Sequence, residues 1–342
     1  MDGKVNFSRS SILIGAVVVV GVVVMIAVVY YATTTRDSRT GISDVFIYDL
    51  EKYQKTDPAL IKYEETGGIK TGFQYVFAIT IDSRDRVYVA GDKAIRVFSS
   101  EGDTLSELKL TDAARCLAVA GDGTIYAGLG DHVEVYDPGG TRKARWESPG
   151  PDSILTSIAA YEGEIFVADA GGRVVLRYDE SGNLLNRIGE RDEERNIPGL
   201  VVPGPYLDLA VAPDGLLRVT NPGVQQIEAY TFDGYMELSW GKPSPEIDGF
   251  SGCHNPVNFA ILSDGRFVTC EKGLPRVKVY TPEGVFESVV AGTELFDMTE
   301  EDFISDGETD QTKVGLDVAV DSRGRVYVLD PVEKAVRVFK SI

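Results

Sequence analysis

Short apolar runs separated by tight turns fill the chain from about residue 57 to its end, and one pattern recurs six times. Each copy consists of an apolar strand, a turn and a second apolar strand. The turn carries glycine or aspartate, which tolerate the backbone conformations that a hairpin needs. The first strands of the six predicted hairpins start at Ile79, Leu117, Ile158, Leu209, Phe259 and Val318.

A third strand follows each hairpin and ends in an aromatic residue. In five copies a glycine stands four residues later and turns the chain into a fourth strand, such as residues 184–188 or 236–240. These pairs are Phe98 and Gly102, Tyr136 and Gly140, Tyr178 and Gly182, Tyr230 and Gly234, and Tyr280 and Gly284. Four antiparallel strands in each repeat of about 40–50 residues are typical of a β-propeller blade.

The sixth copy lacks a fourth strand, because its third strand ends at Phe339 and the sequence stops at Ile342. A propeller removes open sheet edges by closing into a ring. The missing strand is therefore expected before the first copy, where residues 60–64 alternate apolar and polar. The pattern predicts an all-β, six-bladed β-propeller over residues 57–342, with blade 6 closed by a strand at about residues 60–64.

Three stretches of the chain resemble the signature of NHL repeats. They are residues 169–178, residues 276–280 and the segment from Trp240 to Pro256. The resemblance covers about residues 57–342 and implies a six-bladed propeller. NHL-type propellers include binding platforms, lyases and receptor fragments, so the resemblance leaves the activity open.

Residues 12–32 form a run of 21 residues without a charge or a proline. A helix of this length spans roughly 30 Å, the thickness of the hydrocarbon core of a bilayer. The run is too long for a cleaved signal peptide, and residues 30–34 match a cleavage site poorly. We therefore predict a single transmembrane helix at 12–32, after a short N-terminal tail (1–11) and before a tether (33–56).

The orientation of this helix is only weakly encoded. Lys4 and Arg9 precede the span, and Arg36 and Arg39 follow it, so the charges of the two flanks nearly balance. The free amino terminus favours an internal N-terminus. The propeller is accordingly expected on the non-cytosolic side of a membrane, periplasmic or extracellular.

Charge and cysteine content exclude several classes of function. The formal net charge of −19 argues against nucleic-acid binding and against binding of anionic lipids through a polybasic segment. Three cysteines are too few for a disulfide framework, and no CxxC motif occurs. Cys253 and Cys270 are predicted at the same rim of blade 5. Two free thiols are favoured over a disulfide there, because the predicted strand pairing does not place them opposite each other.

Polar residues are expected at one mouth of the central channel, at the start of the first strand and the end of the second. The predicted pairing sets Ser157 beside Asp169, Asp208 beside Asn221, Asn258 beside Glu271, and Asp317 beside Asp330. His254 lies in a loop expected to enter the same mouth. The candidate ligand-binding residues are thus Asp169, Asp208, Asn221, Asn258, Glu271, Asp317, Asp330 and His254; no catalytic residue is assigned.

Five carboxylates at one mouth would repel one another unless a cation, buried protons or hydrogen bonds compensate. The first interpretation is a Ca²⁺ or Mg²⁺ site formed by the oxygens of Asp208, Asn258, Glu271 and Asp317. The second, which we favour, is that these residues cap turns and bond neighbouring blades. No cofactor is predicted beyond this possible ion.

Some six-bladed relatives, the gluconolactonase-like hydrolases, hold a divalent metal at this mouth. Their pattern has an Asn or Asp where this chain has Leu207, Val257 and Leu316, which counts against a lactonase. A zinc hydrolase needs imidazoles, and the chain has only His132 and His254. The favoured hypothesis is a membrane-anchored, non-catalytic module that binds or scaffolds a partner protein. The alternatives are a metal-assisted hydrolase or lyase at the channel mouth, and a sensor of a small cationic ligand.

Overall fold

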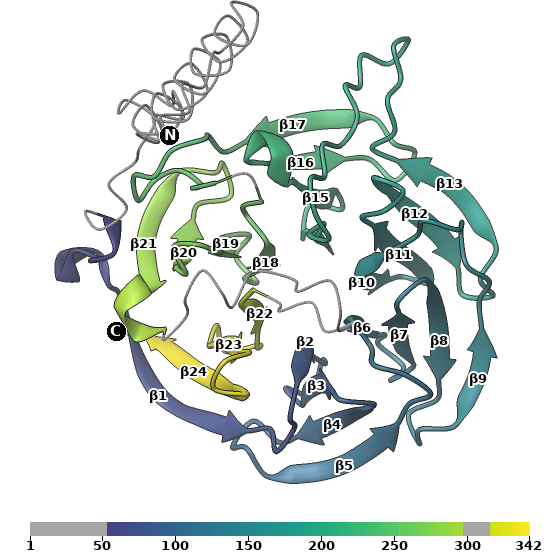
Figure 1. Ribbon diagram of the computed structural model, residues 1–342, viewed down its shortest axis with the longest axis horizontal. Helices are drawn as coiled ribbons and strands as arrows, with labels where there is room; N and C mark the ends of the chain where they lie inside the picture. The colour runs from purple at the N-terminus through teal and green to yellow at the C-terminus, as the bar shows by residue number, and fades with distance from the viewer. Residues whose placement is uncertain (1–52, 253, 297–314) are drawn as a thin grey trace, which may run out of the picture. The chain divides into compact units, whose positions relative to one another are not determined.

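The computed structural model describes residues 53–252, 254–296 and 315–342. These residues form six four-stranded antiparallel sheets arranged around a central axis (Figure 1). The prediction of an all-β, six-bladed propeller is confirmed. The predicted transmembrane helix and most of its tether lie outside the described residues, among which no helix is long and apolar enough to cross a membrane.

Each blade runs outward from an innermost strand that lines the axis. Blades 1 to 3 consist of β2 (Val76–Ile81), β3 (Val87–Gly91), β4 (Ala94–Phe98) and β5 (Thr104–Lys109); β6 (Cys116–Val119), β7 (Ile125–Leu129), β8 (His132–Tyr136) and β9 (Arg142–Arg145); and β10 (Leu155–Tyr161), β11 (Glu164–Asp169), β12 (Val174–Asp179) and β13 (Leu184–Ile188).

Blades 4 to 6 repeat this plan, with short 3-10 helices in three of the connecting segments. They consist of β14 (Leu209–Val211), β15 (Leu217–Asn221), β16 (Gln226–Tyr230) and β17 (Met236–Trp240); β18 (Asn258–Ile261), β19 (Phe267–Cys270), β20 (Val277–Tyr280) and β21 (Phe286–Ala291); and β22 (Asp317–Val320), β23 (Val326–Asp330), β24 (Ala335–Ser341) and β1 (Tyr63–Lys70). The 3-10 helices are η3 (Pro58–Leu60), η4 (Pro222–Val224) and η5 (Thr293–Leu295).

The ring is closed by β1, which pairs antiparallel with β24 from Tyr63 opposite Ser341 to Lys70 opposite Ala335. This strand overlaps the predicted 60–64 segment at only two residues. Leu60 instead ends η3, a turn that starts at Pro58 and is capped by the Asp57 carboxylate, which accepts the Ala59 amide. The alternating pattern at 60–64 therefore marked the approach to the strand rather than the strand itself.

The hydrophobic core is divided into six clusters, each between two adjacent blades. Trp146, at the outer end of blade 2, packs on the turn of blade 3 at Gly182. A Cβ at Gly182 would lie 2.5 Å from the indole nitrogen of Trp146. Trp240 packs on Gly284 of blade 5 in the same way. The recurring glycine thus serves both the turn and the contact with the preceding blade.

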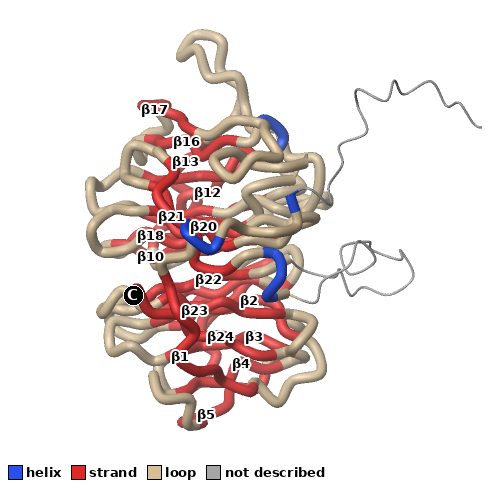
Figure 2. The backbone as a smooth tube through the Cα atoms, turned by 90° about the vertical axis from the view of Figure 1, so that its left-hand side faces the viewer, coloured by secondary structure: helices blue, strands red, loops and turns tan. Residues whose placement is uncertain are grey.

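The antiparallel order gives the propeller two different faces. The segments that join one blade to the next lie on one face, which we call the loop face, together with the turns between second and third strands. The remaining hairpin turns form the opposite face. Figure 2 shows loops and turns on both sides of the strands. Of the short helices, η5 lies in the segment between blades 5 and 6.

Candidate functional site

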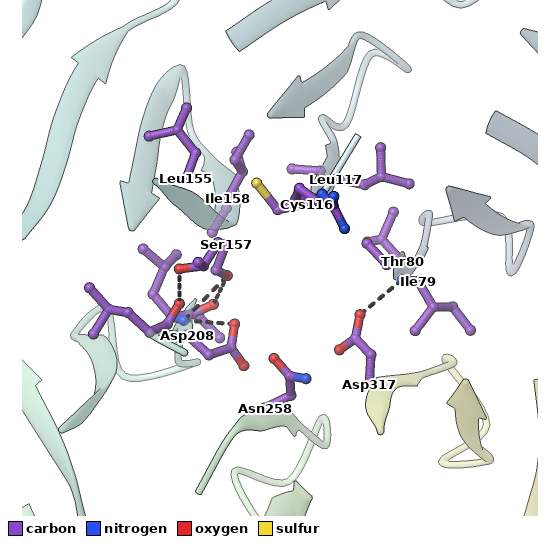
Figure 3. A pocket seen from close by; sticks show the side chains of 18 of the residues that line it. Ile79, Thr80, Cys116, Leu117, Leu155, Ser157, Ile158, Asp208, Asn258 and Asp317 are labelled. Carbon is purple, nitrogen blue, oxygen red and sulfur yellow. Dashed lines mark hydrogen bonds between the residues drawn. The ribbon is translucent and has the colours of Figure 1, made fainter. Parts of the chain in front are cut away.

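A cavity of about 820 Å³ occupies the centre of the propeller and is lined by the innermost strands of all six blades. One position recurs on each of these strands near the loop face, and we call the six residues there the channel ring. Figure 3 shows the polar members Asp208, Asn258 and Asp317 pointing into the cavity. The channel ring consists of Ala78, Cys116, Ser157, Asp208, Asn258 and Asp317.

The Asp208 carboxylate joins blade 4 to blade 5. One of its oxygens accepts the backbone N–H of Leu209 at 2.9 Å, and the other accepts that of Phe259 in β18 at 2.7 Å. Burial raises the pKa of Asp208 to about 6, although hydrogen bonds from Ser157, Phe259 and Leu209 act in the opposite direction. The two accepted amides make this carboxylate part of the blade interface.

Asp317 forms the corresponding link from blade 6 to blade 1. Its carboxylate accepts the N–H of Val318 at 2.8 Å and that of Ile79 in β2 at 2.9 Å. Burial and the nearby charge of Asp208 raise the pKa of Asp317 to about 7. This side chain therefore fastens the last blade to the first, next to the closing strand pair.

The other two polar ring residues follow the same rule. The Asn258 side-chain amide donates to the carbonyl of Leu316, in the segment that leads into blade 6, at 2.8 Å. The Ser157 hydroxyl accepts the N–H of Leu209 in blade 4 at 3.3 Å. Each polar ring residue thus bonds the backbone of the next blade, which is the structural interpretation favoured from the sequence.

The other five candidate residues do not line the cavity. The predicted pairing of the first and second strands was wrong by one residue: Asn258 stands opposite Cys270 and Asp317 opposite Leu329. In blade 3 a bulge sets Leu155 opposite Asp169. A shift of one residue turns a side chain to the other face of a strand. The residues at the ends of the second strands therefore leave the channel.

Asp169 and Asp330 cap loops instead of facing the cavity. The Asp169 carboxylate accepts the N–H of Ile154 and that of Gly172, both at 2.9 Å, and the hydroxyl of Ser153 at 2.8 Å. One oxygen of Asp330 accepts two amides of the turn after β23. Burial raises the pKa of Asp330. Both side chains satisfy backbone donors that the turns leave unpaired.

Asn221 and Glu271 hold inter-blade loops. The Asn221 side chain accepts the N–H of Val201 at 2.9 Å and donates to Glu228 at 2.8 Å. Glu271 is fully buried and accepts the N–H of Ser251 at 2.9 Å, with Arg276 and Lys278 as its ion-pair partners. These contacts engage the side-chain polar atoms of Asn221 and Glu271 without a ligand in the channel.

His254 lies beside Tyr206 on the loop face, with the two ring centroids 5.8 Å apart. Tyr206 lines the cavity, whereas His254 does not. The ammonium of Lys272 sits 4.3 Å from the Tyr206 ring centroid. Burial and the Lys272 charge lower the pKa of His254. The imidazole therefore stands next to the mouth of the cavity and not within it.

The proposed metal-binding set is not assembled in the structure. Asp208, Asn258 and Asp317 share the cavity, but the Glu271 carboxylate is held in ion pairs outside it. Both carboxylates that remain accept backbone amides, and Asn258 uses its amide group as a donor. Within the part of the chain that the structure describes, no group of three or more His, Cys, Asp and Glu side chains has a geometry that would hold a metal ion. The donor set does not fit the Ca²⁺ or Mg²⁺ site of the first interpretation.

Two cysteines are buried near the axis. Burial raises the pKa of the Cys116 thiol and of the Cys270 thiol, and neither forms a disulfide within the described residues. A raised pKa disfavours the thiolate that nucleophilic chemistry needs. Cys253 lies outside the described residues, so the expectation about a Cys253–Cys270 disulfide stays a prediction.

A charged residue in the middle of each third strand went unnoticed in the sequence. Arg96 donates to the carbonyl of Thr71 at 2.6 Å, and Arg177 donates to that of Phe232 at 3.1 Å. Both acceptors belong to segments outside the blade of the donor. The charge recurs once per repeat, which was the available signal. The six residues are Arg96, Glu134, Arg177, Glu228, Lys278 and Arg337.

Comparison with known proteins shows likeness in fold at low sequence identity. No protein-family model matches the chain, and no curated protein matches it. Among solved structures, virginiamycin B lyase from Staphylococcus aureus is similar over 82% of this chain and 99% of its own, with 13% identity and a TM-score of 0.52. A protein of unknown function from Bacteroides thetaiotaomicron is similar over 81% of this chain and 71% of its own, with 16% identity and a TM-score of 0.56.

These likenesses support a six-bladed propeller and carry no information on activity, because the identities are so low. The similarity to NHL repeats remains a resemblance of short motifs, since no family model matches.

Proposed function

We propose that this protein is a non-catalytic binding module, anchored in a membrane by residues 12–32, whose propeller docks a partner protein. The proposal rests on how the polar side chains of the channel ring are bonded. Every polar side chain of the ring bonds the backbone of the next blade. Groups that hold the scaffold together in this way are poorly placed for proton transfer or metal binding.

The remaining chemistry of the channel supports the same proposal. The Cys116 thiol lines the cavity, and burial raises its pKa, which disfavours the thiolate. His254, a candidate ligand-binding residue, lies outside the cavity lining. A rigid ring of blades with exposed loops is a common architecture for binding other proteins.

Site-specific photocrosslinking of the full-length protein in its membrane tests the proposal. A photoreactive residue placed at Val201 on the loop face, at Leu185 in β13 or at Leu105 in β5 replaces a side chain that is about half exposed. We expect a discrete protein adduct from at least one of these three sites, and not from all of them. Absence of adducts at every exposed position would contradict the module.

The anchor has its own test. We expect the full-length protein to stay in the membrane fraction after alkaline carbonate washing and to keep its N-terminal residues. A mature protein that starts near residue 33 would show that residues 12–32 belong to a cleaved signal peptide. That outcome would remove the anchor and leave the binding role of the propeller to be tested separately.

The second candidate is a hydrolase, a lyase or a cation sensor that acts at the channel, and the cavity of about 820 Å³ favours it. Two structurally similar proteins are streptogramin-type lyases, although they share only fold-level similarity with this chain. Added Ca²⁺ should raise the melting temperature if the channel binds a cation. The double variant Asp208→Asn, Asp317→Asn should abolish that rise. No effect of Ca²⁺ on the unmodified protein would rule against a Ca²⁺ site.

A further inference from the structure

Exposed apolar side chains gather on the outer rim at blades 3 and 4. In β13, Leu184 and Leu185 are 46% and 48% exposed, and in β17, Met236 and Leu238 are 37% and 42% exposed. Tyr235, in the turn before β17, is 51% exposed. Among the described outermost strands, only these two expose more than one large apolar side chain.

The outermost strand of a blade has a free edge that can pair with another chain. Natural sheets protect such edges with charged residues, and β9 does so with Arg142, Lys143 and Arg145. β13 instead exposes two adjacent leucines, at a bulge where Leu185 has no partner residue on β12. An unprotected apolar edge is a liability unless a partner covers it, so this strand is the best candidate for an interface.

A hollow of about 460 Å³ lies beside β13. The loop that follows β13 projects beyond the ring of strands (Figure 1) and is closed on itself by paired hydrogen bonds between Asp192 and Ile197. Arg195 of this loop stacks over the Tyr235 ring, 4.6 Å from its centroid. We call the hollow the rim groove, and the residues that define it are Leu184, Leu185, Arg187, Arg191, Arg195 and Gly234.

The rim groove is rich in arginine, although the chain carries a net charge of −19. Three arginines line it, and two of them pair with carboxylates of the same lining: Arg187 lies 3.2 Å from Glu190 and Arg195 lies 3.5 Å from Asp192. Arg191 pairs with Glu193 at 2.8 Å, but both side chains are more than 70% exposed. Exposed pairs of this kind contribute little, so a carboxylate of a ligand can replace Glu193 at small cost.

We propose that the rim groove binds an extended segment of a partner protein in which apolar and acidic side chains alternate. This inference rests on the proposed function and names the part of the partner that is recognised. A segment laid along the five residues of β13 would cover about 17 Å. Alternation places apolar side chains on the leucines and Tyr235 and carboxylates against the arginines, while the strand edge pairs with the backbone of the segment.

A defined peptide tests the proposal on the full-length protein in detergent micelles. The probe is a fluorescein-labelled peptide of about seven residues that alternates leucine and glutamate, measured by fluorescence anisotropy. Its counterpart alternates leucine and lysine. We expect the glutamate peptide to bind at least about tenfold more tightly, with an affinity that falls as salt is added.

Variants locate the site on the rim. Arg191→Glu and Leu185→Asp should each weaken binding of the glutamate peptide by about tenfold or more. Leu105→Asp changes an equally exposed leucine on β5 of blade 1 and should leave binding unchanged. Three outcomes would each overturn the proposed role of the rim groove. They are equal binding of the two peptides, no binding of either, and an equal effect of Leu105→Asp and Leu185→Asp.

The outcomes also separate this inference from the proposed function. If the peptides fail but photocrosslinks form at Val201 on the loop face, the rim groove is wrong and the binding module stands. If no crosslink forms at any exposed position, the module itself fails. A glutamate-peptide preference that Arg191→Glu abolishes supports both.

Discussion

Asp317 holds a partly buried carboxylate at the channel, where two blades provide its hydrogen-bond donors. The amides of Val318 and Ile79 compensate part of the desolvation, but burial still raises its pKa to about 7. Between about pH 4 and pH 7 the folded protein therefore binds more protons than the unfolded chain. The free energy of unfolding falls as pH rises through that window. The stabilisation that comes from burying the neutral acid is fully present only below the pKa of Asp317 in the unfolded chain.

Asp317→Asn should weaken this pH dependence. The variant loses an acceptor for one amide, so it should be less stable than the unmodified protein at pH 4. The difference should shrink by on the order of 2–4 kcal/mol by pH 8, because only the unmodified protein must ionise the buried acid. Urea unfolding at the two pH values measures the change. Asp103→Asn, at an exposed turn, should track the unmodified protein, and an undiminished gap for Asp317→Asn would contradict the argument.

Gly284 and Gly215 separate the two roles of a turn glycine. Both have φ of +79°, but a Cβ at Gly215 meets nothing within 4 Å, whereas one at Gly284 would lie 2.3 Å from the Trp240 ring. Gly215→Ala should cost about 1 kcal/mol for the backbone alone. Gly284→Ala should cost a further 1–3 kcal/mol or so, because Trp240 must move. Equal losses of unfolding free energy would show that the turn, and not the blade contact, requires the glycine.

At the scale of single elements, blade 5 contains a buried ionic cluster that fixes a loop. Glu271 accepts two hydrogen bonds from Arg276, and Lys278 lies 3.0 Å from the same carboxylate. Lys278 also donates to the carbonyls of Ile247 and Gly249. Burial lowers the pKa of Lys278 to about 8, against the opposing effect of Glu271. The cluster thus ties the segment between blades 4 and 5 to the interior of blade 5.

Glu271→Gln should be strongly destabilising. The change leaves two buried cations without a counter-charge, which costs on the order of 3–5 kcal/mol. Glu107→Gln is the matched control, because Glu107 pairs with Arg96 at 2.7 Å in a half-exposed position. That control should cost less than about 1 kcal/mol. Chemical denaturation of both variants measures the two losses, and similar values would show that Glu271 is not essential to the cluster.

At the scale of the whole molecule, the propeller depends on contact between the two ends of its chain. β1 supplies the outermost strand of blade 6, and its Tyr63 and Ile69 are both buried. The Ile79 amide and the Asp317 carboxylate link the same two blades at the channel. Blades 6 and 1 are therefore joined both at the rim and at the axis.

A fragment of residues 53–342 should unfold in a single cooperative transition, and a fragment of residues 71–342 should not. Loss of β1 leaves β24 with an open edge and removes buried contacts, so we expect a loss of more than about 5 kcal/mol, comparable to the stability of a typical domain. Urea unfolding followed by intrinsic fluorescence, with light scattering for aggregation, compares the fragments. Equal midpoints for the two fragments would contradict closure by β1.

The sequence by itself determined the number of blades and the strands within them. Alternation of apolar and polar residues and the turn glycines are local features, and local backbone preferences decide them. The polar ring residues Asp208, Asn258 and Asp317 were found in the same way, because each stands at or directly before the start of an innermost strand.

Only the tertiary structure decided the register and the use of the polar residues. The alternating pattern marks where each strand lies but not which residue of the neighbouring strand stands opposite it. The difference of one residue moved four side chains away from the cavity: Asp169, Asn221, Glu271 and Asp330. The closing strand was misplaced because pairing between chain ends depends on contacts some 270 residues apart. Which donors a buried carboxylate meets is likewise set by the neighbouring blade, and no local pattern in the chain encodes that neighbour.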